Sequence, residues 1–382
     1  MHEHKQNQCK RKMRHRKNVM RFIIFCITVG IVFMFIYYRN LRKEISARQK
    51  WLETVLTGEK KWILENQGPE GEIYMNGSKA GDVNPYFACI AALGLLAETK
   101  NCPMTETEKK AVGRYLDWHT GILLETDGKM GIYRKESGKL IYKEKADSED
   151  GYLGMYLFLM GKYLEKTEST ELPEYWKKGI SLALKKIQSL MQDGITQVSE
   201  ENTTAYLMDN LEVWKGLYEL ELAGLEDTQA ISEMREKIQA QIEKTFWDDT
   251  NQRWRIIGNS DLYHQAEFYP DGVAQIYPLI YEFPVKEKKK QKILYDQFTE
   301  KFQWQKLNKK RTGFLWAMTG MAAAQMGDIN NLEELIGNYE TEYCENRKYP
   351  LYTGEAGWIC MECGKLYGLY ERKIKTGFIL CA

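Results

Sequence analysis

The most constraining feature of this sequence is a type of cluster that recurs six times between residues 84 and 358. Each occurrence is a polar, aromatic or acidic cluster that opens a helix rich in small and apolar residues. The six clusters are Asn84-Pro85-Tyr86-Phe87, Asp147-Ser148-Glu149-Asp150-Gly151-Tyr152, Tyr206-Leu207-Met208-Asp209-Asn210, Phe268-Tyr269-Pro270-Asp271-Gly272, Gly313-Phe314-Leu315-Trp316 and Tyr352-Thr353-Gly354-Glu355-Ala356-Gly357-Trp358. More highly charged helices are predicted between them.

Two kinds of helix therefore alternate along the chain. Stretches such as 175–191 and 229–246 place Lys and Glu on one face, whereas 88–97, 151–164 and 318–326 are apolar nearly all round, which predicts burial. The predicted helix starts lie near residues 47, 84, 104, 147, 173, 203, 227, 264, 285, 311, 329 and 352. Six helices of each kind predict an all-α fold over residues 51–373, an (α/α)6 toroid whose parallel inner helices begin at one mouth. Short β-hairpins are predicted at 128–142 and 252–257.

The N-terminal segment predicts a membrane anchor. An apolar run over 22–38 is just long enough to cross a hydrocarbon layer of about 30 Å. Residues 1–21 form a basic tail, and this heavier positive flank predicts a cytoplasmic N-terminus and a single pass through the cell membrane. No small-residue cleavage site follows the run, which favours an uncleaved signal anchor. Residues 39–50 are then a charged stalk to an extracytoplasmic domain, and 374–382 are a C-terminal tail.

Histidine and cysteine usage predicts neither a metal nor a cofactor. Only His119 and His264 lie beyond the anchor, whereas a zinc site needs three or four clustered N or S ligands. Cys360 and Cys363 form a C-x-x-C inside a helical pattern without a second pair, and we predict buried thiols. The basic tail is interpreted as a topology signal, so no nucleic-acid partner is predicted.

The acidic residues of the clusters predict a carbohydrate site, because glycoside cleavage needs two carboxyl groups. Asp271 is the predicted base, since a helix start should keep it ionised. Asp150 is the second catalytic candidate, and Asp147, three residues earlier, can share its face and hold a sugar hydroxyl. Glu355 is the candidate general acid, because apolar neighbours would raise its pKa. Asp209 is the alternative acid, and it is also predicted to contact the substrate. Each of these carboxylates could instead serve only as a helix cap.

Aromatic residues in the same clusters offer flat faces on which a sugar ring can stack. At helical spacing each of them could equally be a core residue. The predicted substrate-binding aromatics are Tyr86, Tyr152, Tyr206, Tyr269, Trp316 and Trp358.

These clusters resemble the six-hairpin glycosidase superfamily and, within it, glycoside hydrolase family 8 and its uncharacterised membrane-anchored bacterial relatives. Residues 146–150 are similar to that family's Ala-Thr-Asp-Gly-Asp signature, which implies that Asp150 takes the place of its second aspartate and Ser148 that of its first. Residues 269–275 are similar to Tyr-Asp-Ala-x-Arg, which implies that Asp271 is the catalytic base. The family's acid lies in Glu-x-x-x-Tyr-Gly, and the matching residues 82–87 contain no glutamate.

The leading prediction is a membrane-anchored extracytoplasmic glycoside hydrolase that acts on a cell-surface or exported polysaccharide. The tether also makes polysaccharide synthesis or export machinery a candidate partner. One alternative is a glycan-binding or assembly protein without activity, and another is a polysaccharide lyase or uronyl hydrolase on the same scaffold. Anionic substrates such as uronate polymers are conceivable because basic residues lie in predicted loops: Arg134, Lys135, Arg311 and Lys348.

Overall fold

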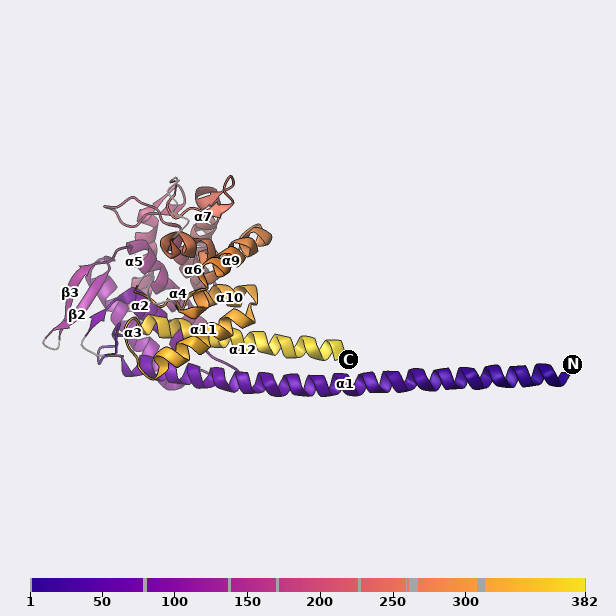
Figure 1. Ribbon diagram of the computed structural model, residues 1–382. Coiled ribbons are helices and arrows are strands. Elements are labelled where there is room, and N and C mark those ends of the chain that lie inside the picture. The colour runs from indigo at the N-terminus through magenta and orange to yellow at the C-terminus, as the bar shows by residue number, and fades with distance from the viewer. Residues whose placement is uncertain are drawn as a thin grey trace. The chain divides into compact units, whose positions relative to one another are not determined.

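The computed structural model describes residues 2–77, 81–136, 139–169, 172–225, 228–258, 260, 267–307 and 313–381, with side chains from residue 13 to residue 376 except residue 16 (Figure 1). Its contacts divide the chain into two units. One unit comprises residues 1–51 and 367–382, and the other comprises residues 52–366. The predicted helix start near 264 and the one near 311, together with His264 and Arg311, lie outside the described residues.

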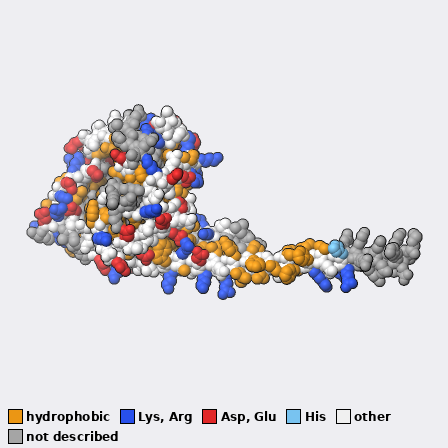
Figure 2. Space-filling model, viewed as in Figure 1, with side chains coloured by type: hydrophobic (Ala, Val, Ile, Leu, Met, Phe, Trp, Pro, Cys, Tyr) orange, Lys and Arg blue, Asp and Glu red, His pale blue; other side chains and the backbone are white. Residues whose placement is uncertain are grey.

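The N-terminal segment is a single helix, α1 (His2–Glu65), so the predicted stalk over 39–50 is helical. Its part from Met13 to Glu65 is the one described helix that is long and apolar enough to cross a membrane. The apolar side chains of 22–37 are largely exposed, as Figure 2 shows for the hydrophobic stretch of this helix.

The second unit is built from alternating inner and outer helices, which confirms the predicted (α/α)6 toroid. The inner helices are α2 (Pro85–Leu95), α4 (Glu149–Thr167), α6 (Leu207–Leu222), α8 (Val273–Ile280), α10 (Thr319–Met326) and α12 (Thr353–Cys381). The outer set comprises α1, α3 (Glu106–Glu125), α5 (Glu174–Leu190), α7 (Thr228–Phe246), α9 (Lys288–Phe302) and α11 (Ile329–Tyr339). The inner helices are apolar nearly all round because each is covered by its neighbours.

Short strands and turns connect the helices. β1 (Asp82–Val83), β2 (Gly131–Glu136) and β3 (Lys139–Lys145) form an antiparallel sheet in that order, which includes the predicted hairpin near 128–142. The second predicted hairpin has a different partner, because β7 (Arg253–Trp254) pairs with β6 (Trp247–Asp248) rather than with 255–257. The remaining elements are β4 (Met191–Gln192), β5 (Ile195–Thr196) and the single turns η1 (Phe268–Gly272), η2 (Trp304–Lys306) and η3 (Glu340–Cys344).

Two inner helices, α8 and α10, are preceded by irregular turns. Before α8, Pro270 has no N–H to donate and Tyr269 is extended, with φ −127° and ψ 136°. Before α10, Trp316 has φ 58°, a left-handed conformation that interrupts a right-handed helix. The chain therefore turns at both places before the regular helix starts.

Glycines let the inner helices pack backbone against backbone. A Cβ added to Gly216 on α6 would lie 2.2 Å from the carbonyl oxygen of Gly154 on α4. A Cβ added to Gly357 on α12 would lie 2.2 Å from the carbonyl oxygen of Ile90 on α2, which closes the ring between the last and the first inner helix. Any larger side chain at these positions would push neighbouring helices apart.

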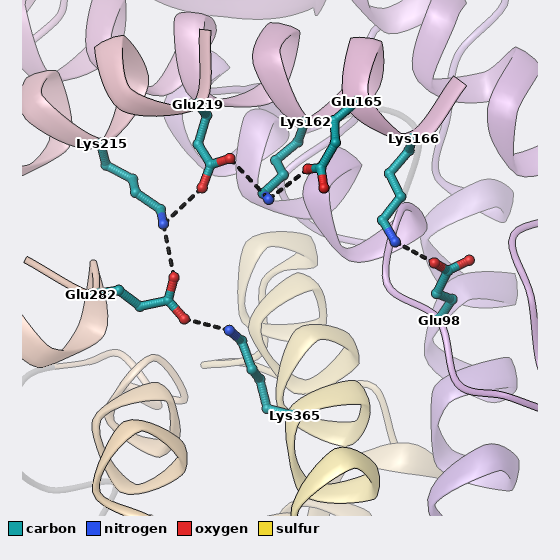
Figure 3. Close-up of polar contacts among 8 residues, drawn as sticks. All are labelled: Glu98, Lys162, Glu165, Lys166, Lys215, Glu219, Glu282 and Lys365. Atoms are coloured by element: carbon teal, nitrogen blue, oxygen red, sulfur yellow. Dashed lines mark hydrogen bonds and ion pairs between the residues drawn. The ribbon is translucent and has the colours of Figure 1, made fainter. Parts of the chain in front are cut away.

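An ion-pair network lies toward the opposite ends of the inner helices. Figure 3 shows its six linked members, Glu165, Lys162, Glu219, Lys215, Glu282 and Lys365, together with a separate ion pair between Lys166 and Glu98. The buried ammonium of Lys215 lies 2.8 Å from Glu219 and 3.0 Å from Glu282. Burial alone would raise the pKa of Glu282, but Lys215 and Lys365 outweigh it and hold this pKa at about 2. The network thus joins α6 to the chain after α8 and to α12.

We predict that Gly216→Ala destabilises the toroid by about 1–3 kcal/mol, because the new methyl group cannot fit against the α4 backbone. The free energy of unfolding would be measured by denaturant titration of the full chain in detergent, followed by tryptophan fluorescence. Gly337→Ala on α11 is the matched control, since nothing lies within 4 Å of its added Cβ, and it should be neutral or stabilising. Equal stability of both variants would contradict the close packing of α4 and α6.

Candidate active site

A cavity of about 760 Å³ opens where the inner helices begin. Every one of the six inner helices contributes residues from its first turns or from the segment directly before it. Eight of the predicted site residues line it: Tyr86, Asp147, Tyr152, Asp209, Tyr269, Trp316, Glu355 and Trp358. The toroid therefore brings together clusters that are separated by more than two hundred residues in sequence.

One wall of the cavity is acidic and comes from α4 and α6. Asp147 and Ser148 lie directly before α4, and Asp209 and Glu212 lie in the first two turns of α6. A Cβ added to Gly151 would lie 2.7 Å from Glu212 Oε2, 2.8 Å from Ser148 Oγ and 3.5 Å from Asp209 Oδ1. The three polar groups thus converge on Gly151, where only a glycine leaves room for them.

Glu212 is a cavity-lining carboxyl group that the sequence analysis did not single out. Its Oε1 accepts hydrogen bonds from the hydroxyl groups of Tyr86 (2.5 Å), Tyr277 (2.6 Å) and Tyr281 (3.3 Å). Burial raises the pKa of Glu212 to about 7, although these hydroxyl groups act in the opposite direction. Its position three residues after Asp209 on one helix face was the available signal.

Asp209 combines access to the cavity with an unfavourable environment for negative charge. Its side chain is only half-buried, because it faces the cavity. Burial, followed by the charges of Asp150 and Glu212, raises the pKa of Asp209 well above its usual range. This environment favours the protonated form of Asp209, which is the form a general acid requires.

Glu355 lies on the other side of the ring. Its Oε1 accepts the backbone N–H groups of Leu315 (3.2 Å) and Trp316 (3.1 Å), and its Oε2 accepts that of Ala317 (2.9 Å). Burial raises the pKa of Glu355 to about 7, while the three N–H groups favour its ionised form and limit the rise. These bonds also stabilise the left-handed turn at Trp316.

The order of contacts around the ring sets the two acidic positions opposite each other. α2 packs on α4, α4 on α6, α6 on α8 and α8 on α10. Gly320 of α10 lies against Glu362 of α12, and α12 returns to α2. Two inner helices therefore separate α6 from α12 in either direction, so Asp209 and Glu355 face each other across the cavity.

A continuous row of aromatic rings forms another part of the wall. The ring centroids of Tyr269 and Trp316 are 4.6 Å apart, and those of Trp316 and Phe314 are 6.2 Å apart. Phe314 in turn stacks on Phe87 at 5.7 Å and lies 5.5 Å from Tyr352. Such rings present flat apolar faces with polar edges, which suit the apolar faces of a sugar chain.

Three predicted site residues are not part of the cavity wall. Asp150 is fully buried, where its carboxylate accepts hydrogen bonds from Ser148 Oγ (2.8 Å) and Thr196 Oγ1 (2.7 Å). Burial raises the pKa of Asp150 to about 6. Asp271 is 1% exposed within the turn before α8, and Tyr206 lies in a β-bridge with Ile257. Asp150 and Asp271 are not among the described residues that line the cavity, and their catalytic roles remain predictions.

Polar groups of two clusters act as helix caps. Asn84 Oδ1 accepts the backbone N–H of Tyr86 at 2.9 Å, and Ser148 Oγ accepts that of Gly151 at 3.2 Å. Asn84 and Ser148 therefore cap α2 and α4, and Asp147 is not needed as a cap. Its side chain is exposed at the cavity.

The thiols and His119 lie away from this chemistry. Cys360 and Cys363 are fully buried free thiols, as predicted. His119 is buried in α3 with its Nδ1 3.1 Å from the hydroxyl group of Tyr115, and burial lowers its pKa to about 3. No group of three or more His, Cys, Asp or Glu residues in the described part of the chain could hold a metal ion.

Neither a protein-family model nor a curated protein matches this sequence. Solved structures do share its fold. A glycosidase with a glutamate replaced by alanine has a TM-score of 0.61 and 12% identity, over 85% of this chain and 99% of that one. The α-1,6-mannanase GH76A of Salegentibacter sp. HEL1_6, an inactive variant with two aspartates replaced by alanine and bound to α-1,6-mannotetrose, has a TM-score of 0.54 and 11% identity, over 83% and 99% of the two chains.

A third similar structure is an α-amylase from Clostridium perfringens, with a TM-score of 0.53 and 13% identity over 82% of this chain and 97% of the amylase. At such low identities the comparisons establish the fold rather than the reaction. The chain shares the toroidal fold of these glycosidases, as the six clusters predict.

We predict that Glu355→Gln loosens the turn before α10, because an amide side chain offers one acceptor oxygen instead of two for the three N–H groups. Hydrogen–deuterium exchange should show about tenfold or faster exchange at Leu315, Trp316 and Ala317. Glu212→Gln is the control, since its side chain contacts none of these amides, and should leave their exchange unchanged. Unchanged exchange in Glu355→Gln would show that its carboxylate does not hold the turn.

Proposed function

We propose that the protein is a glycoside hydrolase that cleaves a cell-surface or exported polysaccharide outside the cell membrane. The observation that carries the proposal is the placement of Asp209 and Glu355 on opposite sides of one large cavity with an aromatic wall. Glycoside cleavage needs two such carboxyl groups, one protonated and one ionised. The shared fold with glycosidases supports the same class of reaction.

In this proposal Asp209 is the general acid. Burial and the neighbouring carboxylates raise its pKa and favour its protonated form, from which it donates a proton to the oxygen of the scissile glycosidic bond as that bond breaks. Glu355 is the general base, which removes a proton from a water molecule while the water oxygen bonds to the anomeric carbon. The products are two shorter sugar chains, and the proton taken up by Glu355 returns to solvent as Asp209 is reprotonated.

The ring geometry favours inversion at the anomeric carbon. Adjacent packed helices have axes about 8–10 Å apart, so opposite helices of a six-membered ring are separated by about twice that distance. Side chains that point inward from opposite walls then leave room for a water molecule, as the separation of about 6.5–9.5 Å in inverting enzymes requires. A retaining enzyme would need the two groups about 5 Å apart.

The anchor completes the proposal. The apolar stretch of α1 spans the membrane, and the basic residues before it keep the N-terminus in the cytoplasm. The toroid then lies outside the cell, where a fixed tether restricts it to glycans made or exported at the same membrane. Polysaccharide synthesis or export machinery is the corresponding partner.

One observation favours a second candidate, a glycan-binding protein without activity. Both carboxylate oxygens of Glu355 are already hydrogen-bonded to backbone N–H groups. A glutamate that serves only to hold the Trp316 turn would leave the cavity able to bind a sugar chain but unable to activate water.

Substitution separates the two candidates. Asp209→Asn and Glu355→Gln should each lower kcat on a cleaved polysaccharide by about 10²–10⁴-fold, because each removes one proton-transfer step. Reducing-end release by the full chain over a panel of surface glycans measures this effect. Asp209→Asn should regain activity on aryl glycosides with good leaving groups, which need no proton, whereas Glu355→Gln should not.

Asp271→Asn is the control, because Asp271 does not line the cavity, and it should retain activity within about tenfold. A full loss in Asp271→Asn with normal activity in Glu355→Gln would support the sequence-based assignment of the base instead. No release from any glycan, together with retained glycan binding, would favour the binding protein.

The pH profile should have its rising limb near neutrality. Glu355 must be ionised to act as a base, and because its pKa is raised to about 7, kcat/KM should increase as pH rises through about 7. At higher pH it should fall again when Asp209 loses the proton that its raised pKa retains. A profile that declines steadily from acidic pH through neutrality would contradict these two roles.

A further inference from the structure

The row of aromatic rings on the cavity wall does not end at the cavity. Tyr352 lines the cavity and lies beside Phe314. The ring centroids of Tyr352 and Tyr349 are 6.1 Å apart, at an interplanar angle of 79°, and Tyr349 is not among the lining residues. The row that starts at Tyr269 therefore extends past the cavity to Tyr349.

Tyr349 is unusually open to solvent for an aromatic side chain. It is 70% exposed, the highest value among the large hydrophobic side chains that the structure describes. An exposed ring forgoes the favourable free energy that burial of its apolar surface would give. Single exposed apolar residues are nevertheless common on outer surfaces, and Tyr175 on α5 and Ile293 on α9 are examples. Tyr349 differs from them because it adjoins a row of rings that lines a cavity.

Two contacts hold the ring of Tyr349 in place. One is the edge-on contact with Tyr352. The other is at Gly313, where an added Cβ would lie only 2.8 Å from the hydroxyl oxygen of Tyr349. Gly313 directly precedes Phe314, so Tyr349 is attached to the row at two points. A ring that is already positioned loses little conformational entropy when a ligand binds.

A flat aromatic face at the end of such a row suits a sugar ring, which presents C–H groups on its face and hydroxyl groups at its edge. The cavity has a volume of about 760 Å³, within the range of about 300–1,000 Å³ that is typical of sites for small ligands. A sugar chain that stacks on Trp316 inside the cavity reaches Tyr349 only if the chain continues beyond the cavity. Tyr349 thus offers a contact that only a long chain can use.

Building on the proposed hydrolase, we propose that the substrate is a long sugar chain, of which one unit outside the cavity stacks on Tyr349. Tyr349 is then an outer subsite that selects polymers over short oligosaccharides. It touches no reacting atom, because the proposed acid and base lie at the cavity. Its contribution is the same in the ground state and the transition state, so it lowers KM and leaves kcat unchanged.

The dependence of binding on chain length tests this subsite. Linear oligosaccharides from disaccharide to octasaccharide would be prepared in three series, of α-1,6-linked mannose, β-1,4-linked glucose or β-1,4-linked N-acetylglucosamine. Isothermal titration calorimetry with the full chain in detergent, carrying Asp209→Asn to prevent turnover, measures Kd. In at least one series Tyr349→Ala should weaken binding of the longest chains by about threefold to tenfold, because one stacked ring is lost. The same substitution should leave the Kd of the disaccharide and the trisaccharide unchanged.

Two further variants make the result specific. Tyr349→Phe keeps the flat face and should retain the affinity for long chains. Tyr175→Ala removes an exposed tyrosine from the outer helix α5 and should change no Kd. Equal loss of affinity for short and long chains in Tyr349→Ala, no binding in any of the three series, or no loss at any length would overturn the proposal. The last result is the one expected if the ring contacts a protein partner instead of a sugar.

The outcome is separable from that of the proposed hydrolase. Cleavage of a polysaccharide with the same KM in wild type and Tyr349→Ala would overturn the outer subsite and leave the hydrolase standing. Length-dependent binding that requires Tyr349, without cleavage of any glycan, would support the subsite and overturn the hydrolase.

Discussion

The structure depends on the parallel packing of six inner helices around one axis. Because these helices begin at the same end, their polar openings meet there, and the apolar remainder of each helix is buried. Direct backbone contact at Gly154, Gly216 and Gly357 keeps the ring narrow enough for opposite walls to act on one ligand. The ion pairs around Lys215 and Glu282 join the same helices further along.

The fold could be predicted from sequence because its signal is repeated. Alternating apolar and amphipathic stretches define two helix classes, and six copies of each leave little choice of architecture. The regular helices α8 and α10 begin only at Val273 and Thr319, after an extended Tyr269 and a left-handed Trp316. Such local turns depend on contacts with distant residues. Glu355, for example, accepts hydrogen bonds from three backbone N–H groups before α10. The hydrophobic periodicity of the sequence carries no information about these contacts.

The site was harder to predict, because it depends on how each helix is rotated. Asp147 precedes the N-cap residue Ser148 and so lies outside the helix, whereas Asp150 lies in its first turn, and the two side chains therefore do not share a helix face. Asp147 lies at the cavity, while Asp150 is buried against Thr196. Glu212 was missed because its role depends on hydroxyl groups from α2 and α8, far away in sequence.

The most direct test of the account is a crystal structure of the Glu355→Gln variant with a bound oligosaccharide. The account predicts a sugar chain in the cavity, one ring stacked on the aromatic row at Trp316 and a glycosidic oxygen within hydrogen-bond distance of Asp209. Residue 355 should lie on the opposite side of that bond with a water molecule between. Sugar bound elsewhere on the toroid, or both side chains on the same side of the bond, would contradict it.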